Sequence, residues 1–445
     1  MSKTVSLHTL GCKLNYSETS TISGLFHKNG FHIKNYGEHS DIFVLNTCTV
    51  TDNSDKECRQ IIRSVLSNNP DTYVIVLGCY AQLKPDEIST IKGVDLVLGT
   101  NEKFKVFDYA DNFEKKSYSC IFTSPLNEIT DFDYAFSSDI DVRTRAFLKI
   151  QDGCDYNCSF CTIPLARGSS RSLAIDRVIE NAKKIIYSGY KEIVLTGVNT
   201  GDYLYKNGTE KSYKLIDVLL ELDKLEISRI RISSIEPNLL SDEIIQLVKS
   251  SSKFCKHFHI PLQSGDSDIL KLMSRRYNRD TFENLIYKLN DEIPDIGIGV
   301  DVIIGFPGET DEKFENTCQF LESLPISYLH VFNYSERKDT HAIDLPGKVD
   351  ILKRKHRSKV LRGLSIKKKQ NFYKSHYGIT KKVLFETFKE NGLINGFTDN
   401  YIKITMKGVK DMENSILPVK ILEADSANVC NAELIDDYKI IQDCI

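Results

Sequence analysis

The sequence predicts an α/β protein built from three folded units: a small parallel α/β domain, a partial (β/α)6 barrel and a small all-β barrel. Strand and helix patterns alternate through most of the chain, and its C-terminal part changes to short alternating strands. With 445 residues and 41% hydrophobic content, the chain exceeds the usual size of one domain. We expect domains at 1–115, 141–352 and 383–445, a connector at 116–140 and a basic linker helix at 353–382.

The first unit contains apolar, β-branched runs that are typical of parallel strands. These runs are TVSLHTLGC, DIFVLNTC and TYVIVLGC, and the stretches between them have helical periodicity with Ser at the N-cap. They end at Cys12, Cys48 and Cys79, whereas a fourth strand, VDLVLGT, ends without a cysteine. Ligand sites of open parallel sheets gather outside the carboxyl ends of the strands. We therefore expect these three thiols to converge at one edge of the sheet.

Regular alternation resumes after the connector, whose own pattern is weak. Helix-like stretches such as LAIDRVIENAKKIIYSG separate six strand candidates, which are AFLKIQDG, EIVLTGVN, RIRISSIEP, HFHIPLQSG, IGVDVIIGFPGE and YLHVFNYS. Six β-α units favour a barrel-like parallel sheet whose working residues lie at the strand C-termini. The first of these strands closes on DGC, which contains Cys154. After residue 383, short strands with Gly and Asn turns predict a small all-β module.

One segment concentrates positive charge in a chain whose net charge is only −3. Lys353 to Lys382 contains twelve Lys and Arg and no Asp or Glu. Because cationic side chains that neutralise phosphates release condensed counterions, a polyanion such as RNA is an expected partner. The rings of Phe372, Tyr373 and Tyr377 are candidates for stacking on unpaired bases. A solvated helix face for the charges, and core packing for the rings, are the alternatives.

The start of the chain and its hydropathy indicate a cytoplasmic enzyme without a membrane partner. MSKTVSLHTLGC lacks the features of a signal peptide, and no stretch offers about eighteen uninterrupted apolar residues. The twelve cysteines are therefore expected to be reduced thiols, because disulfide frameworks are typical of short secreted proteins. Reduced thiols in an enzyme of this kind favour metal binding over disulfide formation.

Three cysteines stand close together in DGCDYNCSFCTIP, at the spacing C-x3-C-x2-C: Cys154, Cys158 and Cys161. Structural zinc normally takes four N or S ligands, commonly in two close pairs, and no fourth Cys or His is adjacent. Inert core cysteines would be scattered rather than clustered in one loop. The favoured interpretation is a 4Fe-4S cluster, in which three thiolates leave one iron open for a small molecule.

The same loop, with Phe160 before its last cysteine, resembles the signature loop of radical S-adenosylmethionine enzymes. In that family the open iron chelates S-adenosylmethionine, which is split into methionine and a 5′-deoxyadenosyl radical. Further motifs, spread in order over nearly the whole chain, resemble the methylthiotransferases of this family: GCKLNYSE, NTCTVT, GCYAQ, CTIPLARGSSRS, LTGVNTGDY, RISSIEP, HIPLQSGDSDIL and DVIIGFPGET. Those enzymes carry an N-terminal cluster domain, a radical core and a C-terminal TRAM barrel.

The resemblance implies two 4Fe-4S clusters and two uses of S-adenosylmethionine. Cys154, Cys158 and Cys161 would hold the radical cluster, and Cys12, Cys48 and Cys79 an auxiliary cluster that carries sulfur. S-adenosylmethionine would be both the radical source and the methyl donor. No side chain beyond the cluster ligands is assigned a catalytic role, because no side-chain base removes an aromatic C–H proton at neutral pH. The remaining thiols match no ligand motif and are expected to be structural: Cys58, Cys120, Cys255, Cys318, Cys430 and Cys444.

Strand ends of related radical enzymes contact S-adenosylmethionine, which makes Gly197, Ser234 and Gln263 candidates for that contact. Glycine at a strand end also serves as ordinary turn chemistry. Asp152 and Arg167 flank the cysteine loop, and an ion pair or a capping role is equally compatible with their positions.

Three substrate classes occur within the resemblance: isopentenyladenosine in tRNA, threonylcarbamoyladenosine in tRNA, and an aspartate of a ribosomal protein. NTCTVT, LTGVNTGDY, RISSIEP and LHVFNYSERKDTHA are most similar to the second class, which implies methylthiolation at C2 of the modified adenosine at position 37. The last motif departs from the usual pattern at Asn333, Asp339 and His341, where proline, glycine and proline are expected.

The implied partners are tRNA and an electron donor such as flavodoxin or ferredoxin, and the sequence does not identify the sulfur donor. Two other classes of protein stay open at this point. A non-catalytic RNA-binding protein would fill its cysteine sites with zinc, and an iron–sulfur carrier would perform no methylthiol chemistry.

Overall fold

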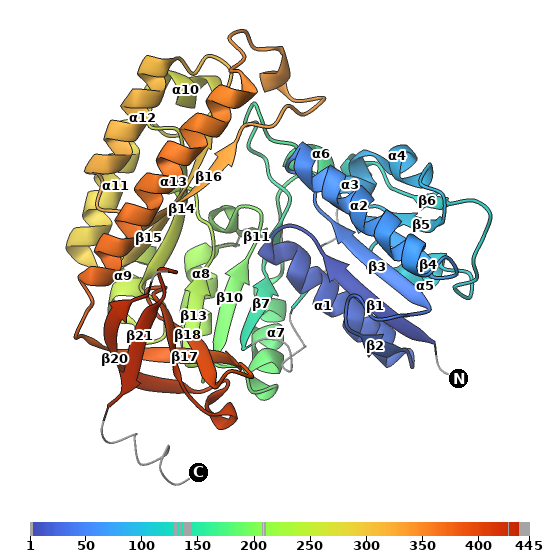
Figure 1. The fold of residues 1–445 in the computed structure, drawn as a ribbon, viewed down its shortest axis with the longest axis horizontal. Helices are drawn as coiled ribbons and strands as arrows, with labels where there is room; N and C mark the ends of the chain where they lie inside the picture. Colours follow the sequence, from blue (N-terminus) through green and yellow to red (C-terminus); the bar gives the residue numbers. More distant parts are fainter. Residues whose placement is uncertain are drawn as a thin grey trace.

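The computed structural model describes residues 3–128, 132, 135–136, 144–206, 208, 211–425 and 427–435. It contains an N-terminal parallel sheet, a central barrel-like sheet and a C-terminal closed barrel, so the predicted fold class is confirmed (Figure 1). Part of the predicted connector and Cys444 lie outside the described residues. None of the helices in the described part of the chain is long and apolar enough to cross a bilayer.

The N-terminal sheet has six parallel strands in the order β2-β1-β3-β4-β5-β6. Two of them, β2 and β6, were not predicted, because each has three residues that are partly or fully exposed and shows no apolar run. The elements are β1 (Thr4–Thr9), α1 (Lys13–Lys28), β2 (His32–Lys34), β3 (Ile42–Thr47), α2 (Asp52–Asn68), β4 (Tyr73–Gly78), α3 (Cys79–Leu83), α4 (Pro85–Ser89), β5 (Val94–Leu98), α5 (Val106–Tyr109), β6 (Cys120–Phe122) and the 3-10 turn η1 (Leu126–Glu128).

The central strands of this sheet are mostly apolar because helices cover both faces. Alternate residues of β3 and β4 belong to two separate cores: one packs around Ile22 and Phe26 of α1, the other around Cys58 and Ile62 of α2. All six residues of β3 and all six of β4 are buried. Because both faces of these strands are buried, their register is fixed. The positions of the residues that follow each strand are fixed with it.

The central unit contains all six predicted strands, in two parallel three-stranded sheets, β13-β10-β7 and β14-β15-β16. A parallel bridge between Ser234 and His259 links the two sheets into one curved surface. The elements are β7 (Arg145–Lys149), β8 (Gln151–Asp152), α6 (Ile163–Arg167), β9 (Arg171–Ser172), α7 (Ile175–Tyr187), β10 (Glu192–Thr196), η2 (Thr200–Asp202), β11 (Leu204–Lys206), β12 (Ser212–Lys214), α8 (Leu215–Asp223), β13 (Arg229–Ile232), η3 (Pro237–Leu239), α9 (Asp242–Ser250), β14 (His257–Gln263), α10 (Ser267–Leu272), α11 (Arg279–Glu292), β15 (Gly297–Ile304), α12 (Asp311–Ser323), β16 (Tyr328–Asn333), η4 (His341–Asp344) and α13 (Ile351–Lys374).

The C-terminal unit is a closed barrel in the order β17-β18-β19-β21-β20. Its elements are β17 (Thr380–Phe388), β18 (Leu393–Thr398), β19 (Lys403–Lys407), η5 (Lys410–Met412), β20 (Ile416–Ala424) and β21 (Cys430–Leu434). Tyr373 is buried in the barrel core, and Phe372 and Tyr377 pack against the same core. Core packing, the alternative to stacking on RNA bases, is therefore confirmed for these rings, because the barrel core gives them a large apolar contact.

The C-terminal barrel covers the N-terminal ends of the central strands. Arg229 donates to the carbonyl oxygens of Phe397 and Lys382, and Arg231 donates to that of Asp399. Gly297, at the start of β15, lies so close to this surface that a Cβ there would approach the Asn400 carbonyl oxygen to 2.2 Å. The two units are therefore held together through backbone carbonyls as well as side chains.

Helix α13 carries most of the predicted basic segment, but part of its charge is structural. Arg354 and Arg357 are buried, and Arg357 pairs with Glu309 and Asp311. On the exposed face Lys353 and Lys367 pair with Asp311 and Glu322. Lys355, Lys359 and Arg362 make no ion pair within the part of the chain that the structure describes. Only this smaller set is available to a polyanion.

Candidate functional site

Three cysteines follow neighbouring strands of the N-terminal sheet at its carboxyl edge. Cys12 lies after β1, Cys48 directly after β3, and Cys79 directly after β4. Gly11 has φ +105°, and a Cβ at this position would lie 2.7 Å from Cβ and 3.0 Å from Sγ of Cys48. A glycine is thus required where Cys48 packs against the residue before Cys12. The sheet brings these thiols together as the strand pattern predicts.

The other three thiols lie on the loop that joins β8 to α6. Gly153 opens this loop at φ +69°, where a Cβ would lie 2.0 Å from the Ser169 carbonyl oxygen. Backbone N–H groups point at two of the sulfurs: Tyr156 donates to Cys154 Sγ and Ile163 to Cys161 Sγ, each over 3.4 Å. Such N–H···S bonds are a usual feature of protein-bound iron–sulfur clusters.

The spacing of the thiols distinguishes between a zinc ion and a larger cluster. Tetrahedral zinc with Zn–S bonds of about 2.3 Å holds its sulfurs about 3.8 Å apart. Among the described residues, neither set of three cysteines brings its ligand atoms within 4.8 Å of one another. A cube of four irons separates its thiolates more widely than one ion does. The two sets of thiols therefore fit a 4Fe-4S cluster better than a single zinc ion.

Burial makes most of these thiols weak acids in the protein without metal. It raises the pKa of Cys48 to about 12, that of Cys161 to about 12 and that of Cys154 to about 11. It also raises the pKa of Cys158, which the charge of Arg275 opposes. A metal bound by these sulfurs would displace their protons.

A buried arginine connects the two thiol sets. Arg167, the last residue of α6, donates from Nε to Cys79 Sγ over 3.2 Å. Its terminal nitrogens donate to Glu18 and Asn15 of α1 and to Asp152 of β8. Arg167 and Asp152 form an ion pair beside the cysteine loop, which is one of the alternatives that the sequence left open. The contact with Cys79 was not suggested by the sequence.

Two buried carboxylates and three buried cations form one network around Arg167. Lys103 and Lys149 both pair with Glu18, at 2.7 Å and 3.2 Å, and Lys149 pairs with Asp152 at 2.7 Å. Burial alone would raise the pKa of Glu18, but the charges of Arg167 and the two lysines hold it well below its usual range. The network spans both domains, because Glu18 and Lys103 belong to the N-terminal unit and the other members to the central one.

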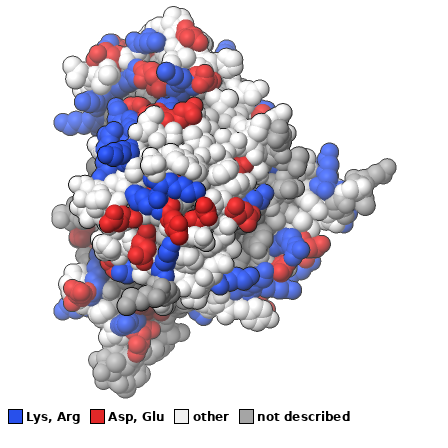
Figure 2. Space-filling view, turned by 90° about the vertical axis from the view of Figure 1, so that its right-hand side faces the viewer, with Lys and Arg blue, Asp and Glu red and all other residues white. Residues whose placement is uncertain are grey.

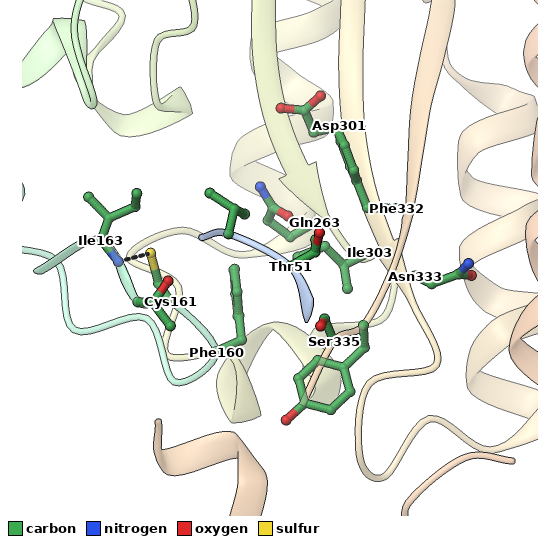
Figure 3. Close-up of a pocket in the computed structure, with 13 residues that line it drawn as sticks. Thr51, Phe160, Cys161, Ile163, Gln263, Asp301, Ile303, Phe332, Asn333 and Ser335 are labelled. Carbon is green, nitrogen blue, oxygen red and sulfur yellow. Dashed lines mark hydrogen bonds between the residues drawn. The ribbon is translucent and has the colours of Figure 1, made fainter. Parts of the chain in front are cut away.

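A cavity of about 240 Å³ lies between the thiol sets and the central strands. Its walls are Val50 and Thr51 after Cys48, residues 160–163 of the cysteine loop, and the carboxyl halves of β14, β15 and β16. Figure 3 shows Cys161 on one side of this space, and Gln263 and Asp301 on the strand side. The cavity is thus shared by both domains.

The three predicted S-adenosylmethionine contacts lie at strand ends, as expected, but only one reaches this cavity. Gln263 lines it and adopts φ +72°, a strained conformation for a residue other than glycine and one often found at binding sites. Gly197 packs against Gln151, where a Cβ would come within 2.9 Å of its side-chain oxygen, and Ser234 bridges to His259. Nearby Asn199 is buried, and its side-chain amide has no hydrogen-bond partner in the described part of the chain.

Two further arginines near the thiols were not identified from the sequence. Arg275 donates to Cys158 Sγ over 3.1 Å and also bonds Glu236. Arg337 reaches from the loop after β16 into the N-terminal domain, where it donates to Asp55 and Thr49. Arginine is common enough that only the fold could single these residues out.

The loop after β16 shows why the sequence can depart from the expected motif. Asp339 adopts φ +66°, a left-handed conformation in which glycine is favoured and aspartate is tolerated. His341 is the first residue of η4, a position where proline is common but not required. The Asn333 side chain points away from Gln263 and Cys161 (Figure 3). Asn333 nevertheless belongs to the described residues that line the cavity, whereas Asp339 and His341 do not.

The face that carries the N-terminal domain has a mixed surface. Figure 2 shows Lys and Arg interspersed with Asp and Glu there, around a broad area that carries neither. A field of a single sign is not present on this face of the described residues, so a nucleic acid would not be held here by charge alone.

Two protein-family models match the chain. The model described as Radical SAM superfamily matches residues 148–321, and the model described as Uncharacterized protein family UPF0004 matches residues 4–99. The first contains the loop with Cys154, Cys158 and Cys161, and the second contains Cys12, Cys48 and Cys79. Each thiol set thus falls within a different recognised unit.

Similar proteins cover almost the whole chain. It is 40% identical to the threonylcarbamoyladenosine tRNA methylthiotransferase MtaB of Bacillus subtilis (strain 168), over 95% of this chain and 94% of that protein. It is 31% identical to the tRNA-2-methylthio-N(6)-dimethylallyladenosine synthase of Clostridium tetani (strain Massachusetts / E88), over 96% of both chains. Among solved structures, the radical S-adenosylmethionine methyltransferase TsrM of Kitasatospora setae shares the fold, with a TM-score of 0.52, 14% identity and 77% coverage of both chains.

Proposed function

The chain belongs to the radical S-adenosylmethionine methylthiotransferase family, in the group of the threonylcarbamoyladenosine tRNA methylthiotransferases, and we propose on this basis that it methylthiolates C2 of N6-threonylcarbamoyladenosine at position 37 of tRNA. The proposal places the enzyme in the cytoplasm, where tRNA is modified.

One observation supports this function most directly: one hydrogen-bonded network joins the two thiol sets, and Cys161 lines the same cavity as Val50 and Thr51, which follow Cys48. Thr162, next to Cys161, donates to the carbonyl oxygen of Thr49, next to Cys48, over 3.4 Å. Arg167 ends the helix that follows the cysteine loop and contacts Cys79. An enzyme that activates a carbon at one metal centre and supplies sulfur from another needs both centres at one substrate position.

We assign Cys154, Cys158 and Cys161 as ligands of one 4Fe-4S cluster, and Cys12, Cys48 and Cys79 as ligands of a second. With S-adenosylmethionine, these groups supply the radical chemistry and the sulfur that side chains cannot supply. Phe160, Ile303 and Phe332 give the cavity apolar walls, which limit the contact of a reactive carbon with water when substrate fills the space.

For S-adenosylmethionine we propose Gly197, Asn199, Ser234 and Gln263 as contacts. The unpaired amide of Asn199 supports this, because a buried amide without a partner is costly unless a ligand satisfies it. Gly197 leaves room where a side chain would collide with Gln151. Gln263 is held toward the cavity by its unusual backbone conformation.

For tRNA we propose the C-terminal barrel and the exposed face of α13 as the binding surface. The cations Lys355, Lys359 and Arg362 are exposed there, and the barrel resembles TRAM modules, which bind RNA. A flavodoxin or ferredoxin is the proposed electron donor.

The test is mass spectrometry of tRNA nucleosides made by the anaerobically reconstituted enzyme. Wild-type protein should convert threonylcarbamoyladenosine-37 to its 2-methylthio form. Cys48→Ala should still release 5′-deoxyadenosine from S-adenosylmethionine but form no methylthiolated nucleoside, and Cys318→Ala, which changes a thiol outside both sets, should match wild type. Product on isopentenyladenosine-37 or on a ribosomal-protein aspartate, with none on threonylcarbamoyladenosine, would disprove the proposed substrate.

A further inference from the structure

Three polar side chains of the central barrel form a compact group apart from the cysteines. They are His259 of β14, Asp301 of β15 and His330 of β16, and their nitrogen and oxygen atoms all lie within 4.8 Å of one another. The strand register explains the grouping, because Asp301 stands directly opposite His330 and opposite Pro261, two residues beyond His259. Side chains two residues apart on a strand share one face.

Within this group the hydrogen bonds are unequally distributed. Nε2 of His259 lies 2.7 Å from Oδ1 of Asp301, so these two side chains satisfy each other in part. The His330 ring lies 5.1 Å from the His259 ring and packs edge-on to Tyr328, but it has no hydrogen-bond partner among the described residues. His330 is therefore a donor or acceptor still available to a ligand.

One member of the group borders the cavity of the candidate radical site. Asp301 lines the cavity together with Gln263 and Cys161 (Figure 3). Phe332, two residues beyond His330 on β16, lines the same cavity. A nucleoside that presents its base near Cys161 would therefore direct a substituent of the base along β15 and β16.

Charges of both signs act on the group. Burial lowers the pKa of His330, the charges of His259 and of Lys13 on α1 lower it further, and the charge of Asp301 raises it. Burial also holds the pKa of neighbouring His257 well below its usual range, and the charge of Arg231 contributes. A ligand that presents an anionic group to His330 and a hydrogen-bond donor to Asp301 matches this arrangement.

We infer that His330, with His259 and Asp301, forms the subsite that recognises the threonylcarbamoyl substituent of the adenosine. This inference rests on the proposed function. His330 donates to the carboxylate of the substituent, and Asp301 accepts from its ureido N–H or hydroxyl group. A dimethylallyl substituent has no carboxylate and no donor, so it would leave these polar groups unpaired.

The test is a binding assay with anticodon stem-loops and the reconstituted full-length enzyme. Three stem-loops carry threonylcarbamoyladenosine, its carboxyl methyl ester, or unmodified adenosine at position 37. Wild-type protein should bind the free acid about 10- to 100-fold more tightly than the ester, the range expected for a hydrogen bond to a charged group. His330→Ala should reduce that ratio to near one without weakening binding of the unmodified stem-loop.

Two variants separate recognition from a general loss of structure. His330→Gln keeps a side-chain donor and should restore part of the preference for the free acid. His39→Ala removes an exposed histidine of the N-terminal domain and should leave the preference unchanged.

Specific outcomes would overturn the inference. One is a His330→Ala protein that keeps the wild-type preference for the free acid. Another is a stoichiometric divalent ion, found by elemental analysis, that His330→Ala loses while the preference persists, which would make the group a metal site. Failure of the proposed function is distinguishable, because wild-type protein would then prefer the free acid in binding yet form no methylthiolated product.

Discussion

Arg167 donates a hydrogen bond from Nε to Sγ of Cys79 over 3.2 Å, although 88 residues separate the two in the chain. The same guanidinium bonds Asp152 next to the loop of Cys154. One side chain therefore hydrogen-bonds a proposed ligand of the auxiliary cluster and also the segment that carries the proposed ligands of the radical cluster.

Arg167→Lys should make the reduction potential of the auxiliary cluster more negative. Hydrogen bonds and positive charge near cluster sulfurs stabilise the reduced form, and lysine cannot reproduce the planar fork that contacts Cys79, Glu18 and Asp152 together. A redox titration followed by electron paramagnetic resonance measures this shift. Arg177→Lys, on the surface helix α7, serves as the control, and equal potentials in both variants would refute the role of Arg167.

Glu18→Gln should weaken the attachment of the N-terminal domain to the central domain. The change leaves Lys103, Lys149 and Arg167 buried without one of their two carboxylates, and breaking a buried ion pair costs about 3–5 kcal/mol. Native-state hydrogen exchange of α1 reports this loss. The control is Glu180→Gln, which breaks an exposed ion pair on α7. It should change the free energy of opening measured by exchange by less than about 0.5 kcal/mol.

Acid should separate the same two domains in the protein without metal. The pKa values of Glu18 and Asp152 are depressed because cations outweigh burial, so both groups bind fewer protons when folded than when unfolded. Their stabilisation is thus fully present above the ordinary carboxyl pKa of about 4 and is lost as pH falls through the lower folded values. Small-angle scattering between pH 7 and pH 3 should show domain opening only below about pH 4, and opening already at pH 6 would contradict this assignment.

Cys158→Ala should remove one cluster and spare the other. Reconstituted wild-type protein should contain about eight iron atoms, and this variant about four. The variant should also fail to cleave S-adenosylmethionine. Iron and sulfide analysis measures the loading, with Cys120→Ala as a control outside both thiol sets, and a colourless zinc protein would rule out the cluster assignment.

Replacement of Lys355, Lys359 and Arg362 by alanine should reduce the salt dependence of tRNA binding. Each lost phosphate contact makes the negative slope of log K against log salt shallower by about 0.7–0.9. The slope of the triple variant should therefore be shallower than that of wild type by about 2–3. Lys367→Ala, which removes a cation already paired with Glu322, is the matched control. An unchanged slope in the triple variant would place the RNA elsewhere on the protein.

The sequence predicts the strands and thiols well because their signals are local. The apolar runs of β3 and β4 and the spacing of Cys154, Cys158 and Cys161 are visible within a few residues of chain. The contact of Arg167 with Glu18 joins positions 149 residues apart, and no local pattern encodes it. The sequence left Tyr373 open between base stacking and core packing for the related reason that a ring in a basic helix has the same local sequence whether it meets RNA or a neighbouring barrel.

The group of His259, Asp301 and His330 shows both what the local sequence predicts and what it does not. Its members lie in predicted strands, so their elements were foreseen, yet the sequence contains no sign that they share one face of neighbouring strands. Strand order and register decide which residues meet, and both depend on packing across the whole barrel.

The C-terminal barrel is fixed to the N-terminal ends of the central strands through Arg229 and Arg231, whereas the cavity lies at their carboxyl ends. The strands hold the barrel and the cavity at a fixed distance from each other. If the tRNA is anchored on the barrel, this distance would determine which nucleotide reaches the cavity. Moving the modified adenosine by one position within the anticodon loop should then abolish methylthiolation while binding persists.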